Sequence, residues 1–240
     1  MSGENNRDPA VRPRRPTRAE QPDRYIVPEC REPVTELYRD AHILVVNKPP
    51  FLLSVPGRAP ENRDCVTARL KRRDPDLRLV HRLDLDTSGV MVFALTRDAQ
   101  SALSRAFQQR RVAKAYQAVV DGLVREDEGE IDLPLCPDWP NRPLQKVCLE
   151  SGKTALTRWR VLRRDASRNR TRLRLEPVTG RSHQLRIHCR EIGHPILGCD
   201  LYAPPAVLGL SDRLLLHAET LAFNHPVTGL WNRFHSPVPF

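Results

Sequence analysis

The sequence predicts an α+β fold built on a mainly antiparallel, mixed sheet with flanking helices. Segments with the composition of strands outnumber segments with the apolar spacing of a helix. The strands also come in hairpins and do not alternate regularly with helices, as they would in a parallel α/β fold. No segment repeats along the 240 residues, a length sufficient to bury one sizeable core. We therefore expect one folded domain.

Residues 29–240 are expected to form this domain, and residues 1–28 a disordered tail that is basic and rich in proline. The tail can bury little apolar surface, because five prolines stand in it among polar and charged residues. The sequence contains no signal peptide and no stretch approaching about 18 apolar residues. We expect a soluble, cytoplasmic monomer that binds no membrane.

The first half of the chain predicts two buried strands and two helices. The apolar run 43–46 is typical of a short strand, and 90–95 of a second one. A short basic helix is predicted over 64–73, with Asp64 as its N-cap. Apolar residues over 99–107 recur with the spacing of an amphipathic helix.

The second half is richer in strands. Alternation of apolar and polar residues predicts a half-exposed strand over 116–120, and two strands over 157–162 and 171–175 are expected to form a hairpin. Ser182 is placed to cap a helix that ends near a glycine and a proline. The last strand is expected over 214–223.

The charge of the chain indicates a polyanionic partner. Lys and Arg number 39 against 29 for Asp and Glu, which favours nucleic acid. Eight arginines fall in the seventeen residues 158–174 of the predicted hairpin. We expect this arginine strip to face the phosphates of RNA, the alternative being a solvated basic surface. The residues of the strip assigned to RNA are Arg158, Arg160, Arg170, Arg172 and Arg174.

The six cysteines show no spacing that indicates zinc, because no pair has the Cys-x-x-Cys pattern. Nothing in their positions suggests a disulfide scaffold. We expect free thiols in a reducing compartment and no metal site.

Polar residues gather in three clusters within apolar sequence, at 81–89, 114–116 and 179–186. Charged groups beside a core strand are costly to bury unless they are paired, so the first cluster indicates either chemistry or a polar loop with an ordinary ion pair between Arg82 and Asp84. Arg181 is placed to pair with a carboxylate from elsewhere in the fold. If that carboxylate is Asp84, its pKa falls and Asp84 becomes a fixed anion suited to nucleophilic attack.

Two other functions stay open on these residues. The segment 84–88 is close to the D-x-D-x-T motif of magnesium-dependent aspartyl phosphatases, but its buried strand follows the motif instead of preceding it. A non-catalytic RNA-binding module would keep the basic residues and not depend on Asp84. His81 as a general base, or His183 and His188 as metal ligands, is less frequent than a structural histidine.

The three clusters, in this order, resemble the motifs of RluA-type pseudouridine synthases. The matching stretches are His81-Arg82-Leu83-Asp84-x-x-Thr87-Ser88-Gly89, Lys114-x-Tyr116 and Thr179-Gly180-Arg181-x-His183-Gln184-Leu185-Arg186. The resemblance continues from about residue 37 to the C-terminus. Segments 52–58 and 138–147 resemble the dual-specificity branch, which modifies both 23S rRNA and tRNA.

The resemblance implies the pseudouridine synthase catalytic fold and an isomerase that needs no cofactor or metal. It implies that Asp84 is the catalytic nucleophile, that Tyr116 stacks on the target base, and that Arg181 holds the Asp84 carboxylate. Arg82 would fill the gap left by a flipped-out loop uridine in structured RNA, and His81 would lie beside the RNA. Asp86 falls at a free position of the motif and is expected to be solvated.

Two departures from the family pattern concern the ends of the domain. Many members carry a small RNA-binding domain in front of the catalytic one, for which the residues before 37 are too few. Relatives also tend to have G-D-x-x-Y where this chain has Cys199 followed by Asp200, so the role of that aspartate is open.

Overall fold

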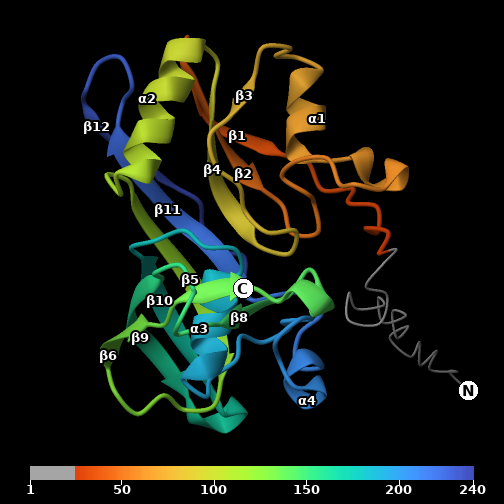
Figure 1. Cartoon of the computed structure of the whole chain (residues 1–240), viewed down its shortest axis with the longest axis vertical. Coiled ribbons are helices and arrows are strands. Elements are labelled where there is room, and N and C mark those ends of the chain that lie inside the picture. The colour runs from red at the N-terminus through yellow and green to blue at the C-terminus, as the bar shows by residue number, and fades with distance from the viewer. Residues whose placement is uncertain (1–24) are drawn as a thin grey trace, which may run out of the picture.

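The computed structural model describes residues 25–240 and consists of one large bent sheet with helices on its faces (Figure 1). Its strand order is β1-β2-β4-β11-β5-β10-β9-β6, with β12 paired to β11 and β3 to β4, while β7 and β8 form a separate hairpin. The pairing of β11 with β4 is parallel and the other pairings are antiparallel. The predicted α+β class with a mainly antiparallel, mixed sheet is therefore confirmed.

The described strands include all those predicted from the sequence; most are longer than predicted, whereas the last one begins at 216 instead of 214. The strands are β1 (Thr35–Arg39), β2 (Ile43–Lys48), β3 (Arg78–Leu79), β4 (Ser88–Ala94), β5 (Ala113–Asp121), β6 (Glu128–Asp132), β7 (Leu135–Pro137), β8 (Gln145–Val147), β9 (Leu156–Asp165), β10 (Arg170–Pro177), β11 (Leu216–Asn224) and β12 (Trp231–His235). The helices are α1 (Val66–Lys71), α2 (Arg97–Gln108), α3 (Gln184–Glu191) and α4 (Pro205–Leu208), with 3-10 turns at Pro60–Arg63, Trp139–Asn141 and Ala166–Arg168. No helix within residues 25–240 is long and apolar enough to cross a membrane.

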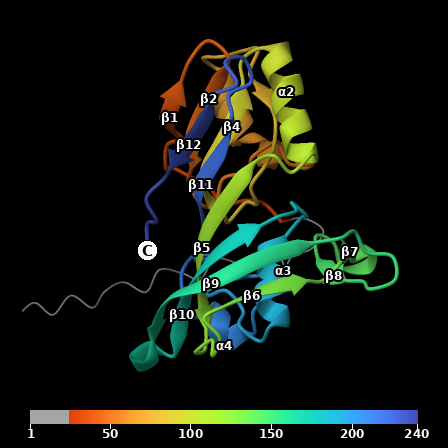
Figure 2. The same cartoon turned by 90° about the vertical axis from the view of Figure 1, so that its left-hand side faces the viewer.

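The sheet has two halves that share its long central strands. One half holds β1, β2 and β4, and the other holds β6, β9 and β10. β5 and β11 lie between the two halves, where the sheet twists strongly (Figure 2). α2 covers one face of the first half, where Ala99 and Leu103 pack with Val92. Met91 and Phe93 point to the opposite face, toward α1 and the loop before β4. α3 covers β5 and β10 in the second half.

The cap of α1 differs from the prediction. The N-cap is Cys65, whose Sγ accepts a hydrogen bond from the backbone N–H of Ala68 at 3.3 Å. Asp64, the predicted cap, instead forms an ion pair with Arg69 at 2.5 Å. The ion pair removes the Asp64 carboxylate from the end of the helix, and the thiol one residue later takes its place.

The start of α3 also differs. The helix begins at Gln184 and is preceded by His183 with φ of 56°, so the predicted cap Ser182 lies outside it. The side-chain oxygen of Gln184 accepts a hydrogen bond from the N–H of Arg181 at 3.0 Å. This bond closes the turn before the helix without a serine cap. The helix ends near the predicted position, before Gly193 at φ of 81°.

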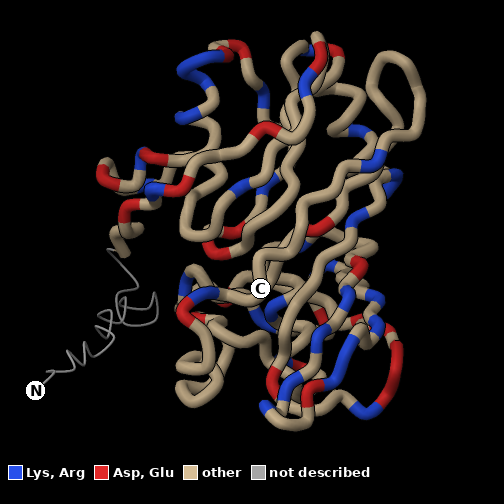
Figure 3. The backbone as a smooth tube through the Cα atoms, turned by 180° about the vertical axis from the view of Figure 1, so that it is seen from behind, with Lys and Arg blue, Asp and Glu red and all other residues tan. Residues whose placement is uncertain are grey.

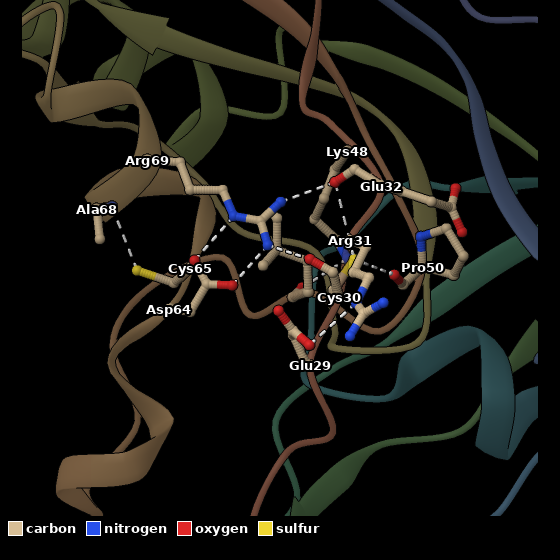
Figure 4. Close-up of polar contacts among 11 residues, drawn as sticks. Glu29, Cys30, Arg31, Glu32, Lys48, Pro50, Asp64, Cys65, Ala68 and Arg69 are labelled. Carbon is tan, nitrogen blue, oxygen red and sulfur yellow. Dashed lines mark hydrogen bonds and ion pairs between the residues drawn. The ribbon is translucent and has the colours of Figure 1, made fainter.

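Arg69 ties the segment before β1 to α1 (Figure 4). Its guanidinium donates to the backbone carbonyls of Cys30 and Glu32, the latter at 2.7 Å, while it also pairs with Asp64. Further upstream, Asn62 bonds to the backbone of residues 25–27. The last residues of the predicted tail are therefore held to the domain, whereas residues 1–24 lie outside the described part of the chain.

His217 on β11 joins three segments inside the core. Its Nδ1 lies 2.8 Å from Ser88 Oγ at the start of β4, and its Nε2 lies 3.2 Å from Ser236 Oγ. The ring is 1% exposed, and burial lowers the pKa of His217 to about 4. The histidine is therefore neutral at physiological pH.

Gly89 provides the first test of the fold. Its φ is +118°, and a Cβ there would lie 2.2 Å from the carbonyl oxygen of Ala218 on β11. We expect Gly89→Ala to lower the free energy of unfolding by about 3 kcal/mol or more, because strain and a backbone clash add. The matched control is Gly229→Ala, at φ of +70° with no atom within 4 Å, which should cost only about 1 kcal/mol. Equal losses for the two variants in urea titrations would contradict the close approach of β4 and β11.

A pH dependence of stability follows from His217. Its pKa is about 4 in the fold and near the ordinary histidine value of 6.5 when unfolded, so the unfolded chain binds more protons between these values. We expect this residue to reduce stability by up to about 3 kcal/mol as the pH falls from 6.5 to 4, with no further loss below 4. His217→Gln should flatten that part of the curve. Parallel curves for wild type and His217→Gln would contradict the assignment.

Candidate active site

The three polar clusters of the sequence meet in one pocket of about 320 Å³. The loop between β3 and β4 provides one wall, β5 the floor, and the turn into α3 the other wall. The lining includes His81, Arg82, Asp84, Phe107, Lys114, Tyr116, Arg181, His183 and Arg186. Asp84, Tyr116 and Arg181, predicted as catalytic from distant positions, therefore line the same cavity.

Asp84 is half-buried, and both of its neighbours are fixed by hydrogen bonds to the backbone. Ser54 Oγ donates to the carbonyl of Leu83 at 2.6 Å and accepts from its N–H at 3.2 Å. On the other side, Lys48 Nζ donates to the carbonyl of Leu85 at 2.9 Å. The carboxylate thus stands on a loop whose position is set by two side chains, one at the end of β2 and one in the loop that follows it.

Lys48 is a buried cation with no carboxylate in its hydrogen-bond set. Its Nζ also donates to the carbonyls of Pro49 and Leu52, each at 2.8 Å. Burial lowers the pKa of Lys48 to about 7, although the charges of Asp86 and Asp84 act to raise it. The three carbonyls supply the dipoles that a buried ammonium group needs.

Arg186 on α3 is the buried cation of the pocket, with 1% exposure. Its Nη2 donates to Asp200 at 2.5 Å, and its Nη1 lies 3.6 Å from Asp86. Burial opposes its charge, but the pKa of Arg186 is raised well above the ordinary value by Cys199, Asp200, Asp86 and Asp84. Asp84 therefore lies in the field of a fixed positive charge.

Asp86 corrects one expectation from the sequence. It was expected to be solvated, but its residue is 7% exposed and its carboxylate faces Arg186. The role of Asp200 was left open because relatives have their aspartate one position earlier, where this chain has Cys199. In the structure Asp200 forms an ion pair with Arg186. Both acids neutralise a cation that would be unfavourable to bury alone.

Tyr116 and His81 both line the pocket as neutral groups. Burial, and then the charge of Asp84, raise the pKa of Tyr116, so its phenol stays neutral beside the carboxylate. The His81 ring stacks on Phe107 with centroids 4.7 Å apart, and its Nε2 accepts from the N–H of Val92 at 3.1 Å. Burial lowers the pKa of His81 to about 3, which makes it a neutral wall residue.

The two arginines at the rim have different surroundings. Arg82 is exposed at the mouth of the pocket. Arg181 is half-exposed, and its Nε donates to the carbonyl of Thr154 at 2.9 Å. The prediction that Arg181 holds Asp84 stays a prediction, and Arg186 enters as a second arginine near that carboxylate.

The arginine strip lies on the other face of the sheet. Cross-strand neighbours share a face, and Leu175 of β10 is opposite Tyr116, whereas Arg174 is opposite Gln117. The strip thus faces away from Tyr116 and the pocket, and Figure 3 shows Lys and Arg positions along these strands from behind. Four of its members are ion-paired within the described residues, namely Arg158 with Glu130 at 2.7 Å, Arg164 with Asp127 at 2.7 Å, Arg170 with Asp165 at 3.2 Å, and Arg174 with Glu176 at 2.7 Å and Glu219 at 3.3 Å.

Sequence reasoning assigned no role to Lys48, Ser54 or Arg186. Lys48 lies just beyond the predicted strand 43–46, and Ser54 acts through its hydrogen bond to Leu83, 29 residues away in the sequence. Arg186 stands in the third cluster, but all residues from 184 to 189 are buried. When a helix is buried on all sides, the sequence shows no distinct polar face, so its pattern does not indicate which side chain points toward the active site.

No group of three or more His, Cys, Asp and Glu side chains within residues 25–240 is arranged to hold a metal ion. Asp86 of the first cluster lies 3.6 Å from Arg186, and Asp84 interacts with the same charge. The residues of this pocket thus offer a carboxyl group, a neutral phenol and arginine cations.

Comparisons with known proteins agree with this arrangement. The family model described as RNA pseudouridylate synthase matches residues 42–191. The dual-specificity RNA pseudouridine synthases RluA of Yersinia pestis and Escherichia coli (strain K12) are each 52% identical over 204 residues. The match covers 85% of this chain and 98% and 93% of the two relatives. The structure of human RNA pseudouridylate synthase domain containing 1 matches with a TM-score of 0.74 at 30% identity, over 89% of this chain and 86% of the other. The chain belongs to the RluA group of the RNA pseudouridylate synthase family.

Proposed function

We propose that this chain is an isomerase that converts loop uridines of structured RNA to pseudouridine, in 23S rRNA and tRNA, with Asp84 as the nucleophile. The observation that carries the proposal is the half-buried Asp84 facing a pocket with Tyr116, in the field of Arg186. The protein acts as a monomer in the cytoplasm, with no metal or cofactor.

The reaction moves the uracil ring from one bond to ribose to another. The bond between N1 and C1′ breaks, the ring rotates, and C5 forms the new bond to C1′ and loses its proton, while N1 ends with a proton. An ionised carboxylate serves whether Asp84 attacks the sugar or the base. Arg186 and Asp84 interact electrostatically, and a nearby positive charge favours the charged form of a carboxylate.

Arg186 is proposed as the main electrostatic partner of Asp84. It is buried, fixed by Asp200 and cannot lose its charge, whereas Arg181 is half-exposed and engaged with the carbonyl of Thr154. Arg181 then serves as a second cation at the pocket wall, available to the phosphate of the bound nucleotide.

The remaining pocket residues receive the bound uridine. Tyr116 stacks on the target base, a contact worth roughly 1–3 kcal/mol for an aromatic side chain. Exposed Arg82 stands where it can enter the RNA helix in place of the flipped base. His81 shapes the wall through its contact with Phe107.

Two alternative functions make different demands on these residues. A non-catalytic RNA-binding module would bind equally well without the Asp84 carboxylate. A magnesium-dependent phosphatase would need Asp86 as a metal ligand, but that residue is buried against Arg186. Insensitivity of the activity to a chelator separates the isomerase from the phosphatase.

The first prediction concerns Asp84. We expect Asp84→Asn to abolish tritium release from RNA labelled at C5 of uridine, because the amide cannot act as the nucleophile. RNA affinity should change by less than about threefold, or roughly 0.6 kcal/mol. Asp76→Asn, at an exposed position before β3, is the control and should release tritium like wild type. Normal turnover by Asp84→Asn would refute the role of Asp84.

The second prediction separates Arg186 from Arg181. Arg186→Gln should lower the free energy of unfolding by about 3–5 kcal/mol, because Asp86 and Asp200 lose their buried partner. Arg186→Lys keeps the charge and should remain folded, but its single-turnover rate at saturating RNA should fall. Arg181→Gln should change stability by less than about 0.5 kcal/mol and weaken RNA binding. A normal rate for Arg186→Lys with a loss confined to Arg181→Gln would return the role to Arg181.

A further inference from the structure

A second groove adjoins the active-site pocket on the other face of the sheet. It has a volume of about 420 Å³ and lies over β5, the end of β10, β11 and β12. Lys114 and Pro177 line both this groove and the pocket with Asp84. The two cavities therefore meet where β5 and the end of β10 separate, and a chain could pass from one to the other.

The floor of the groove is made of small side chains. Ala113 of β5 pairs with Ala222 of β11, and Ala115 with Thr220. Thr220 is 6% exposed, and its Oγ1 has no hydrogen-bond partner within residues 25–240. A flat floor of this kind leaves room for a planar ligand, and the Thr220 hydroxyl is a polar group that the fold does not use.

The walls of the groove carry unneutralised positive charge. Arg110, after α2, and Arg233, on β12, are exposed and form no ion pair with any residue of the described range. Arg158 and Arg174 also line the groove but are paired with acids, and Glu176 is the acidic residue at the wall. Two free cations on opposite sides suit a phosphodiester backbone.

Trp231 supplies an aromatic surface in the same groove. It is 58% exposed, on the same face of β12 as Arg233, two residues away. An exposed tryptophan beside arginines is an arrangement that stacks nucleotide bases. Leu230, which is 68% exposed, stands next to it but does not line the groove.

We infer that this groove binds the unpaired nucleotides next to the target uridine, with one base stacked on Trp231 and phosphates at Arg110 and Arg233. This inference rests on the proposed function, because it places the target uridine in the pocket with Asp84. The strand then passes over Lys114 and Pro177 onto the face that carries the arginine strip.

The test compares Trp231→Ala with the matched control Leu230→Ala, using unmodified tRNA made by transcription. We expect Trp231→Ala to raise both the dissociation constant and KM about tenfold while kcat stays unchanged, and Trp231→Phe to restore most of the affinity. Leu230→Ala should remain within about twofold of wild type, a change below roughly 0.5 kcal/mol. Unchanged affinity for Trp231→Ala, or an equal loss for Leu230→Ala, would overturn the inference.

The salt dependence of binding tests the two cations. Arg110→Gln and Arg233→Gln should each reduce the slope of log affinity against log salt by about 0.7, the value for one phosphate of a single strand. Arg72→Gln, at the exposed end of α1, should leave the slope unchanged. Slopes equal to wild type in both groove variants would overturn the phosphate contacts.

Binding and product formation are measured separately, so the two proposals can fail independently. Product from wild type with unchanged binding by the groove variants refutes the groove and retains the isomerase. Loss of binding by the groove variants, with no pseudouridine formed by wild type, retains the groove and refutes the isomerase.

Discussion

The buried charge of Arg186 is the constraint on which the site depends. A guanidinium with 1% exposure is tolerated only when acids reach it, because the desolvation of one such ion costs several kcal/mol. Asp86 arrives from the loop before β4 and Asp200 from the segment after α3, two parts of the chain that share no local structure. Any fold that satisfies Arg186 must bring these parts together, and Asp84, two residues from Asp86, is then placed at the pocket as well.

The loop that carries Asp84 is held in place by hydrogen bonds, as Arg186 is held by its ion pairs. Lys48 and Ser54 fix the backbone on both sides of Asp84, and Ser88 is bound to His217 where β4 begins. The Asp84 carboxylate must reach one atom of a flipped nucleotide. A loop already held in place loses little conformational entropy when the reaction begins, and this lowers the barrier. The glycine at 89 lets β4 lie against β11 and so completes this support.

The features that the sequence predicted well are those with local causes. Apolar runs and alternation located the strands over 43–46, 90–95 and 116–120, since their signals lie within the segments themselves. The burial of Asp86 had no such signal, because it depends on a helix a hundred residues later. The cap of α1 was misplaced for a local reason, since Arg69, five residues later, competes for the Asp64 carboxylate. The three clusters met in one pocket as expected, but the choice between two arginines of the third cluster needs the direction of each side chain.

The arginine strip shows what alternation predicts and what it leaves out. Arg170, Arg172 and Arg174 stand two residues apart, so the sequence places them on one face of the sheet. It does not say which face holds Tyr116, and the register of β10 with β5 puts the two on opposite sides. An RNA that occupies the pocket can reach the strip around the edge where β5 and β10 separate, since the pocket and the groove share Lys114 and Pro177 there. The groove at that edge, with its unpaired cations and tryptophan, makes such a path continuous. The path explains why the face opposite the pocket carries so much positive charge, because the bound RNA continues onto it.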